Sequence, residues 1–160
     1  MEERVDFASL LGRLVDALNG AGPRDTRLQR ICDLLRSAVP HYQWVGFYVA
    51  DEAKRVLRLG PFSGADTEHR VIPYGRGICG QVAVDPRTFE VPDVTLQDNY
   101  LSCSLDVRSE IVVPVMVGGR FVAQLDIDSH EVAPFSAADR SFLESICEEV
   151  ARLWEVADER

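Results

Sequence analysis

The chain has 160 residues, of which 46% are hydrophobic and 27% are charged, and its formal net charge is −9 at pH 7. This length and composition are those of one globular domain, so we expect residues 1–160 to form a single domain. The negative charge argues against nucleic acid or an anionic membrane as a partner, because each requires a basic face. The apolar runs are too short to span a bilayer and the N-terminus lacks the pattern of a secretory signal, so a cytoplasmic location is predicted.

The first part of the chain predicts two amphipathic helices. Apolar residues recur at helical spacing over 5–18 and stop at segment 19–23, which combines asparagine, glycine and proline. A second apolar stripe follows over 28–39, with Asp25 or Thr26 available as its N-cap. We therefore expect a pair of helices ahead of the first strand.

From residue 44 the hydrophobic period changes to that of strands. Segments 44–49 and 56–59 are predicted as a hairpin, and the second strand is expected to break at Gly60-Pro61-Phe62. Segment 70–73 is extended and leads through a glycine-rich stretch into a short helix predicted over 78–84.

The second half predicts a further hairpin and a long C-terminal helix. Segments 110–117 and 121–128 are rich in β-branched residues and flank Gly118-Gly119, a dipeptide suited to a two-residue turn. Ser136 and Asp139 form a capping-box pattern ahead of the last helical stripe. Helices that bracket a mostly antiparallel sheet indicate an α+β fold, in which helices cover one face and leave the other for loops and a ligand.

Four cysteines, at positions 32, 79, 103 and 147, lack the close paired spacing of a structural zinc site. Cys103 lies in a polar loop, where reactive groups are common, although a lone loop cysteine is also often incidental. Cys79 lies between glycines at a predicted helix start, which would lower the pKa of its thiol. Cys32 and Cys147 lie on apolar helical stripes and are predicted to fill the core.

Three carboxylates form the second candidate group. The period of a strand places Asp126 and Asp128 on one face, and Glu110 begins the partner strand of the same hairpin. Crowded carboxylates raise at least one pKa, so such a cluster can hold a proton for donation and also bind an ammonium group. The alternative is a solvated face of the sheet.

A thiol beside an acid suits the reduction of a sulfoxide. The thiolate attacks the sulfur, the departing oxygen needs a proton, and the cysteine becomes a sulfenic acid that another thiol must remove. Aromatic residues such as Trp44 and Tyr48 would hold the methyl group of a thioether.

Six segments together resemble the GAF-fold free methionine-(R)-sulfoxide reductases. The resemblance implies a central, predominantly antiparallel sheet with the N-terminal and C-terminal helices on one face and a ligand pocket on the other. It also implies reduction of free L-methionine (R)-S-oxide by a thioredoxin-type thiol, a homodimer, and no metal or organic cofactor. The matching segments are residues 44–48, 60–64, 72–80, 91–94, 109–114 and 125–129.

The resemblance also assigns roles to individual residues. It places the nucleophile on Cys103 and a second family cysteine on Cys79. Glu110, Asp126 and Asp128 match the carboxylates that bind substrate and donate the proton. The aromatic pocket residues of the family match Trp44 and Tyr48.

The chain departs from the family pattern at two positions. His69 stands where the family usually has the cysteine that resolves the sulfenic acid, and Ser104 stands where aspartate is common. Three outcomes follow: Cys79 resolves instead, an external thiol does so, or activity is lost while the pocket persists. His69 itself is either a surface residue or a group that lowers the pKa of Cys103.

Two functions without catalysis compete with the reductase. One is a GAF ligand-binding or sensory module, which the missing resolving cysteine favours, but such modules normally regulate an attached domain, for which 160 residues leave no room. The other is a structural dimerising domain that pairs through its end helices.

Overall fold

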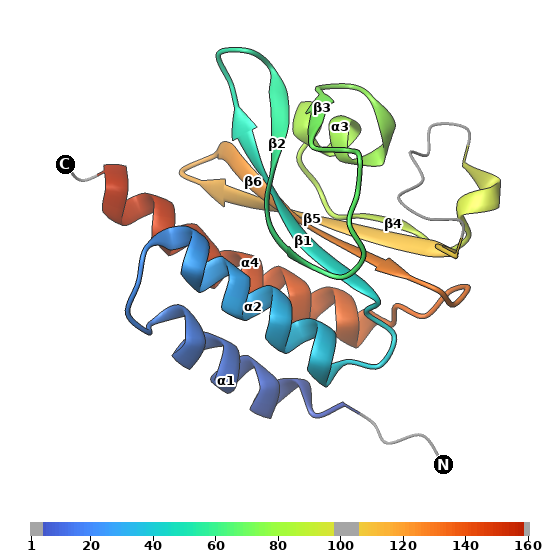
Figure 1. Cartoon of the computed structure of the whole chain (residues 1–160), viewed down its shortest axis with the longest axis horizontal. Helices are drawn as coiled ribbons and strands as arrows, with labels where there is room; N and C mark the ends of the chain where they lie inside the picture. The colour runs from blue at the N-terminus through green and yellow to red at the C-terminus, as the bar shows by residue number, and fades with distance from the viewer. Residues whose placement is uncertain (1–4, 98–105, 159–160) are drawn as a thin grey trace.

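The structure is a computed structural model and describes residues 5–97 and 106–158. A six-stranded antiparallel sheet with strand order β3-β2-β1-β6-β5-β4 forms the centre, and helices lie on both of its faces (Figure 1). The predicted α+β class and GAF-type arrangement are confirmed. In chain order the elements are α1 Phe7–Leu18, α2 Arg24–Ala38, β1 Trp44–Asp51, β2 Val56–Ser63, β3 Val71–Pro73, α3 Gly77–Val84, β4 Phe89–Val91, a 3-10 turn Val94–Leu96, β5 Ser109–Val117, β6 Arg120–Ser129 and α4 Ala137–Asp158.

One face of the sheet is covered by α2 and α4, and α1 packs on these two helices as an outer layer (Figure 1). In α1 the buried residues Leu10, Leu14 and Leu18 recur every fourth position, which forms one apolar stripe. They join the main core between the helices and the sheet. Cys32 and Cys147 are buried in this core, as predicted.

The helix N-termini confirm one predicted cap and correct another. Ser136 and Asp139 cap α4 reciprocally, with the Ser136 backbone N–H donating to Asp139 at 2.8 Å and the Asp139 N–H donating to Ser136 Oγ at 3.1 Å. Helix α2 begins one turn earlier than its apolar stripe suggests, with Pro23 at the N-cap, so the prediction of Asp25 or Thr26 was wrong. Asp25 lies instead in the first turn, where its charge favours the helix dipole.

Strand β2 does not break at Gly60-Pro61-Phe62, contrary to the prediction, and continues to Ser63. The pairing with β1 shifts here, since Gly46 pairs with Phe62 and Tyr48 with Leu59. Two residues of β2 thus oppose one of β1, which is a β-bulge, and a bulge accommodates proline because it needs no ladder N–H there.

The hairpin of β5 and β6 has the predicted two-residue turn. Gly118 and Gly119 have φ angles of 55° and 79°, which glycine adopts without a steric penalty. The turn fixes the register, so Glu110 pairs with Asp128 and Val112 with Asp126. Beyond the register shift near the turn, Ala123, Leu125 and Ile127 of β6 enter the main core, while Asp126 and Asp128 alternate with them and face away from it.

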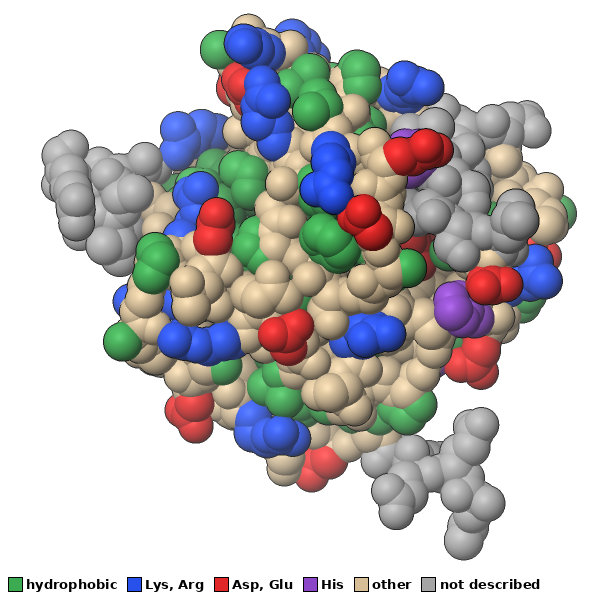
Figure 2. Space-filling model, in the orientation of Figure 1, with side chains coloured by type: hydrophobic (Ala, Val, Ile, Leu, Met, Phe, Trp, Pro, Cys, Tyr) green, Lys and Arg blue, Asp and Glu red, His purple; other side chains and the backbone are tan. Residues whose placement is uncertain are grey.

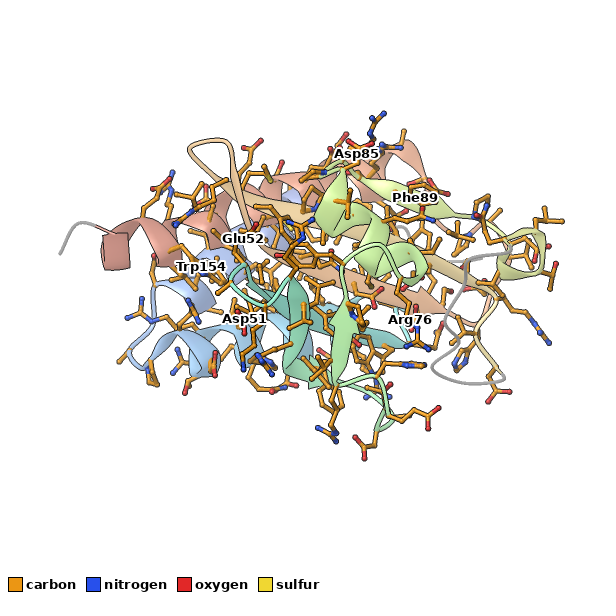
Figure 3. All side chains as sticks on the ribbon, turned by 90° about the horizontal axis from the view of Figure 1, so that it is seen from above. Asp51, Glu52, Arg76, Asp85, Phe89 and Trp154 are labelled. Carbon is orange, nitrogen blue, oxygen red and sulfur yellow. The ribbon has the colours of Figure 1, made fainter. Side chains whose placement is uncertain are left out.

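Helix α3 crosses the opposite face of the sheet. It connects β3, at one edge, to β4, at the other, so this connection spans the sheet from edge to edge. Figure 3 shows the helix over the strands, with Arg76 and Asp85 at its two ends. A second apolar cluster fills the space beneath it; its buried members are Trp44, Tyr48, Leu57, Ile72, Ile78, Cys79, Val82, Ala83, Val91 and Val112.

Within the described residues, no helix has both the length and the apolar content needed to cross a membrane. On the face drawn in Figure 2, acidic and basic side chains are interspersed, and neither sign forms a continuous field there.

Candidate functional site

The register of the central strands aligns the predicted site residues in rows on the face beneath α3. Trp44 pairs with Asp128, which in turn pairs with Glu110, so one row crosses β1, β6 and β5. The next row contains Gly46 and Asp126. Because a Cβ atom at Gly46 would collide with the indole of Trp44, glycine allows this ring to lie across the row of Asp126.

Helix α3 brings Cys79 onto these carboxylates. Its Sγ lies 3.4 Å from Asp126 Oδ2 and 4.0 Å from Glu110 Oε2. Cys79, Glu110 and Asp126 are 6%, 4% and 1% exposed, and Asp128 is also buried. The alternative of a solvated sheet face was therefore wrong, because all three carboxylates are buried.

Burial controls the protonation of this cluster. It raises the pKa of Asp126 above its ordinary value, although hydrogen bonds with Glu110 and Cys79 and the charge of His69 oppose the shift. Burial, followed by the charges of Asp126, Glu110 and Asp128, raises the pKa of the Cys79 thiol well above its ordinary value. The prediction that the start of α3 would lower this pKa was wrong, because desolvation and three carboxylates outweigh the helix dipole.

A cavity of about 10 Å³ lies at this cluster, which is room for roughly one water molecule. His69 lines it and is half-buried, so this histidine is partly exposed at the surface and also forms part of the cavity wall. The Tyr48 hydroxyl donates to the His69 carbonyl at 2.8 Å, which ties this segment to β1. The lining residues are Tyr48, His69, Ile72, Ile78, Cys79, Glu110 and Asp126.

A larger pocket of about 160 Å³ lies beside Trp44 and Asp128, one row further along the sheet. The Trp44 indole N–H donates to the Ala65 carbonyl at 2.9 Å, and its ring stacks on Phe62, which fixes the aromatic wall. The lining residues are Arg36, Gln43, Trp44, Ala65, Asp106, Val107, Asp128 and His130.

The predicted nucleophile, Cys103, lies outside the described residues, as does Ser104. The described chain resumes at Asp106, which lines the larger pocket. Cys32, Cys79 and Cys147, the cysteines within the described ranges, are all buried free thiols.

Comparison with known proteins identifies the family to which this chain belongs. A profile of the GAF domain matches residues 23–153. The free methionine-R-sulfoxide reductase of Saccharomyces cerevisiae is 31% identical over 141 residues, covering 81% of this chain and 78% of that protein. The chain belongs to the GAF-domain family of free methionine-R-sulfoxide reductases.

Two solved structures titled as free methionine-R-sulfoxide reductases share its architecture. The Neisseria meningitidis protein, solved in complex with its substrate, has a TM-score of 0.91 and 29% identity and covers 99% of this chain and 95% of its own. The type II protein of Thermoplasma acidophilum has a TM-score of 0.78 and 36% identity, with 81% and 91% covered.

Sequence reasoning missed part of the pocket wall in this member of the family. Nothing in the local sequence distinguishes His69 from a surface histidine, and only the departure from the family pattern directs attention to it. His130 lines the larger pocket. Its position directly after the strand that carries Asp126 and Asp128 is the one sequence feature that would have suggested a place near the site.

Proposed function

We propose that this protein reduces free L-methionine (R)-S-oxide to L-methionine, with Cys103 as the nucleophile. The observation that carries the proposal is the buried, hydrogen-bonded pair of Glu110 and Asp126, which lines the small cavity next to the larger pocket beside Trp44. Family membership adds support, because relatives from Saccharomyces cerevisiae and Neisseria meningitidis are named free methionine-R-sulfoxide reductases.

The substrate would bind along β6. Asp128 borders the larger pocket beside Trp44 and suits the substrate ammonium, while the indole suits the thioether methyl. Asp126 lies two residues along the strand, roughly 7 Å away by the rise of a β-strand. The sulfoxide then reaches towards Asp126, whose burial favours the protonated form and so allows it to protonate the departing oxygen.

The reaction balances as one thiol oxidised for one sulfoxide reduced. Cys103 attacks the sulfur and forms an S–S bond, and the protonated oxygen leaves as water. A water molecule then attacks Cys103 Sγ, which breaks the S–S bond, releases methionine and leaves Cys103 as a sulfenic acid. An attacking thiol then forms a disulfide with Cys103 and releases water. Because Cys79 is buried and its thiol pKa is raised, we propose that an external thioredoxin-type thiol attacks directly.

Substitution of Cys103 with serine tests the nucleophile. We expect Cys103→Ser to form no methionine from the free R sulfoxide with dithiothreitol as reductant, measured by chromatography. Cys32→Ala, in the main core, is the matched control for loss of a thiol away from the site, with folding of both variants checked by circular dichroism. Undiminished turnover in Cys103→Ser would overturn the mechanism.

Two experiments on the wild type identify the resolving thiol and test the competing sensory role. A wild-type turnover without reductant, stopped with a sulfenic-acid trap, is expected to label Cys103, whereas a bridge between Cys79 and Cys103 would show internal resolution. A folded wild type that binds the sulfoxide in calorimetry without converting it would instead support a ligand-binding module.

A further inference from the structure

A thiol and two carboxyl groups converge from three separate elements. Cys79 comes from α3, Glu110 from β5 and Asp126 from β6, and one potential ligand atom of each lies within 4.8 Å of the others. All three side chains are buried. This set differs from an acidic surface cluster, because it combines a soft sulfur donor with hard oxygen donors in an enclosed place.

The separations suit a small tetrahedral ion. With metal–sulfur and metal–oxygen bonds of about 2.3 and 2.0 Å, tetrahedral angles place the ligand atoms roughly 3.3–3.5 Å apart. The distance of 3.4 Å between Cys79 Sγ and Asp126 Oδ2 already fits this range. The distance of 4.0 Å between Cys79 Sγ and Glu110 Oε2 exceeds this range by about 0.5 Å, so the Glu110 carboxylate would move closer when it binds the ion.

Two further observations point to a ligand at this place. Within the described part of the chain, Asp126 Oδ1 is buried and has no hydrogen-bond partner, and a buried oxygen of this kind is costly unless something binds it. The cavity of about 10 Å³ borders all three side chains and has room for one small guest. His69 also lines that cavity, so an imidazole or a water molecule is available for a fourth position.

We propose that Cys79, Glu110 and Asp126 bind a divalent transition-metal ion, with Zn²⁺ as the first candidate, and that the bound ion competes with the sulfoxide. The ion replaces the proton of the Cys79 thiol and the proton shared by the two carboxyl groups, and both protons are released to solvent. Metal binding is independent of the proposed function. The competition rests on the proposed function, because the ion binds Asp126, the group proposed to protonate the departing oxygen.

Cobalt(II) is the probe for the binding claim, because its tetrahedral thiolate complexes absorb light and Zn²⁺ does not. Titration of the reduced full-length protein with Co²⁺ without oxygen is expected to give a thiolate charge-transfer band that added Zn²⁺ removes. The band should disappear in Cys79→Ser and persist in Cys103→Ser. No band in the wild type, or a band that depends on Cys103, would overturn the proposal.

The carboxylates provide an independent check should Cys79→Ser fail to fold. Glu110→Gln should weaken Co²⁺ binding at least about tenfold, since even outer-shell partners of metal ligands contribute this much to affinity. Glu148→Gln, an exposed carboxylate on α4, is the matched control and should bind as the wild type does. Equal affinity in Glu110→Gln and Glu148→Gln would overturn the proposed ligand set.

The competition claim has its own readout. In the reductase assay, Zn²⁺ is expected to raise the KM for the sulfoxide without lowering kcat, and a chelator should reverse the effect. Inhibition that excess sulfoxide does not relieve would overturn the competition. An inactive protein that still shows the cobalt band would overturn the proposed function and leave the metal site standing.

Discussion

At the scale of single residues, the neighbouring carboxylates of β6 are in different surroundings. Asp126 contacts Cys79 in the enclosed cavity, while Asp128 borders the larger pocket beside Trp44. Under the proposed function the two aspartates therefore have different tasks: Asp126 protonates the departing oxygen and Asp128 binds the substrate ammonium.

This difference predicts distinct kinetic effects. Asp126→Asn should lower kcat roughly 10²- to 10⁴-fold, the usual contribution of a general acid, with a smaller change in KM. Asp128→Asn should chiefly raise KM, because it removes a contact made in both the ground state and the transition state. Steady-state kinetics with the free R sulfoxide measure both effects, and identical changes in the two variants would contradict the assignment.

At the scale of elements, α4 is anchored by a buried polar network around Asp139. Tyr42 Oη donates to Asp139 at 2.7 Å, His41 Nε2 lies 2.7 Å from the same oxygen, and Ser136 donates to the other oxygen. Burial alone would raise the pKa of Asp139, but the hydrogen bonds from His41, Ser136 and Tyr42 outweigh it and lower the pKa to about 2. The charged form of Asp139 therefore stabilises the start of the helix.

The sign of this shift predicts how stability depends on pH. The pKa of Asp139 falls from 3.8 to about 2 on folding, so its contribution of roughly 2 kcal/mol is complete above about pH 5 and is lost as the pH falls through the folded pKa of about 2. Asp139→Asn should lower the free energy of unfolding by about this amount at pH 7, measured in urea, and by progressively less below about pH 5. Glu148→Gln is the control, and a loss that does not change with pH would contradict this account.

At the scale of the whole molecule, the sheet separates two apolar clusters, one on each of its faces. The main core joins α1, α2 and α4 to one face, and the smaller cluster beneath α3 forms the walls of the site. Stability and substrate binding should therefore be separable by mutation.

Leu143 and Ile78 offer a matched test of that separation. Both are buried, Leu143 in the main core and Ile78 on the cavity wall. Leu143→Ala and Ile78→Ala should each reduce the free energy of unfolding by roughly 2–5 kcal/mol, but only Ile78→Ala should also change the KM for the sulfoxide. An equal change of KM in Leu143→Ala would show that the clusters are coupled.

The sequence predicted those features that depend on local pattern. The turn at Gly118-Gly119, the cap at Ser136 and the common face of Asp126 and Asp128 follow from turn chemistry and strand period. The continuation of β2 through Pro61 was missed, because the bulge exists only in its pairing with β1.

The surroundings of the site depend on contacts distant in sequence. The raised pKa of Cys79 comes from burial and from carboxylates on β5 and β6, which α3 meets only after folding. The place of His69 on the cavity wall depends likewise on tertiary structure. The role of Cys103, which lies outside the described residues, stays a prediction.

The two outermost strands of the sheet, β3 and β4, are each only three residues long. Each of these short edge strands offers a second molecule few unpaired N–H and C=O groups of its own. We therefore expect pairing of these two edge strands to contribute little to any association between copies of the chain.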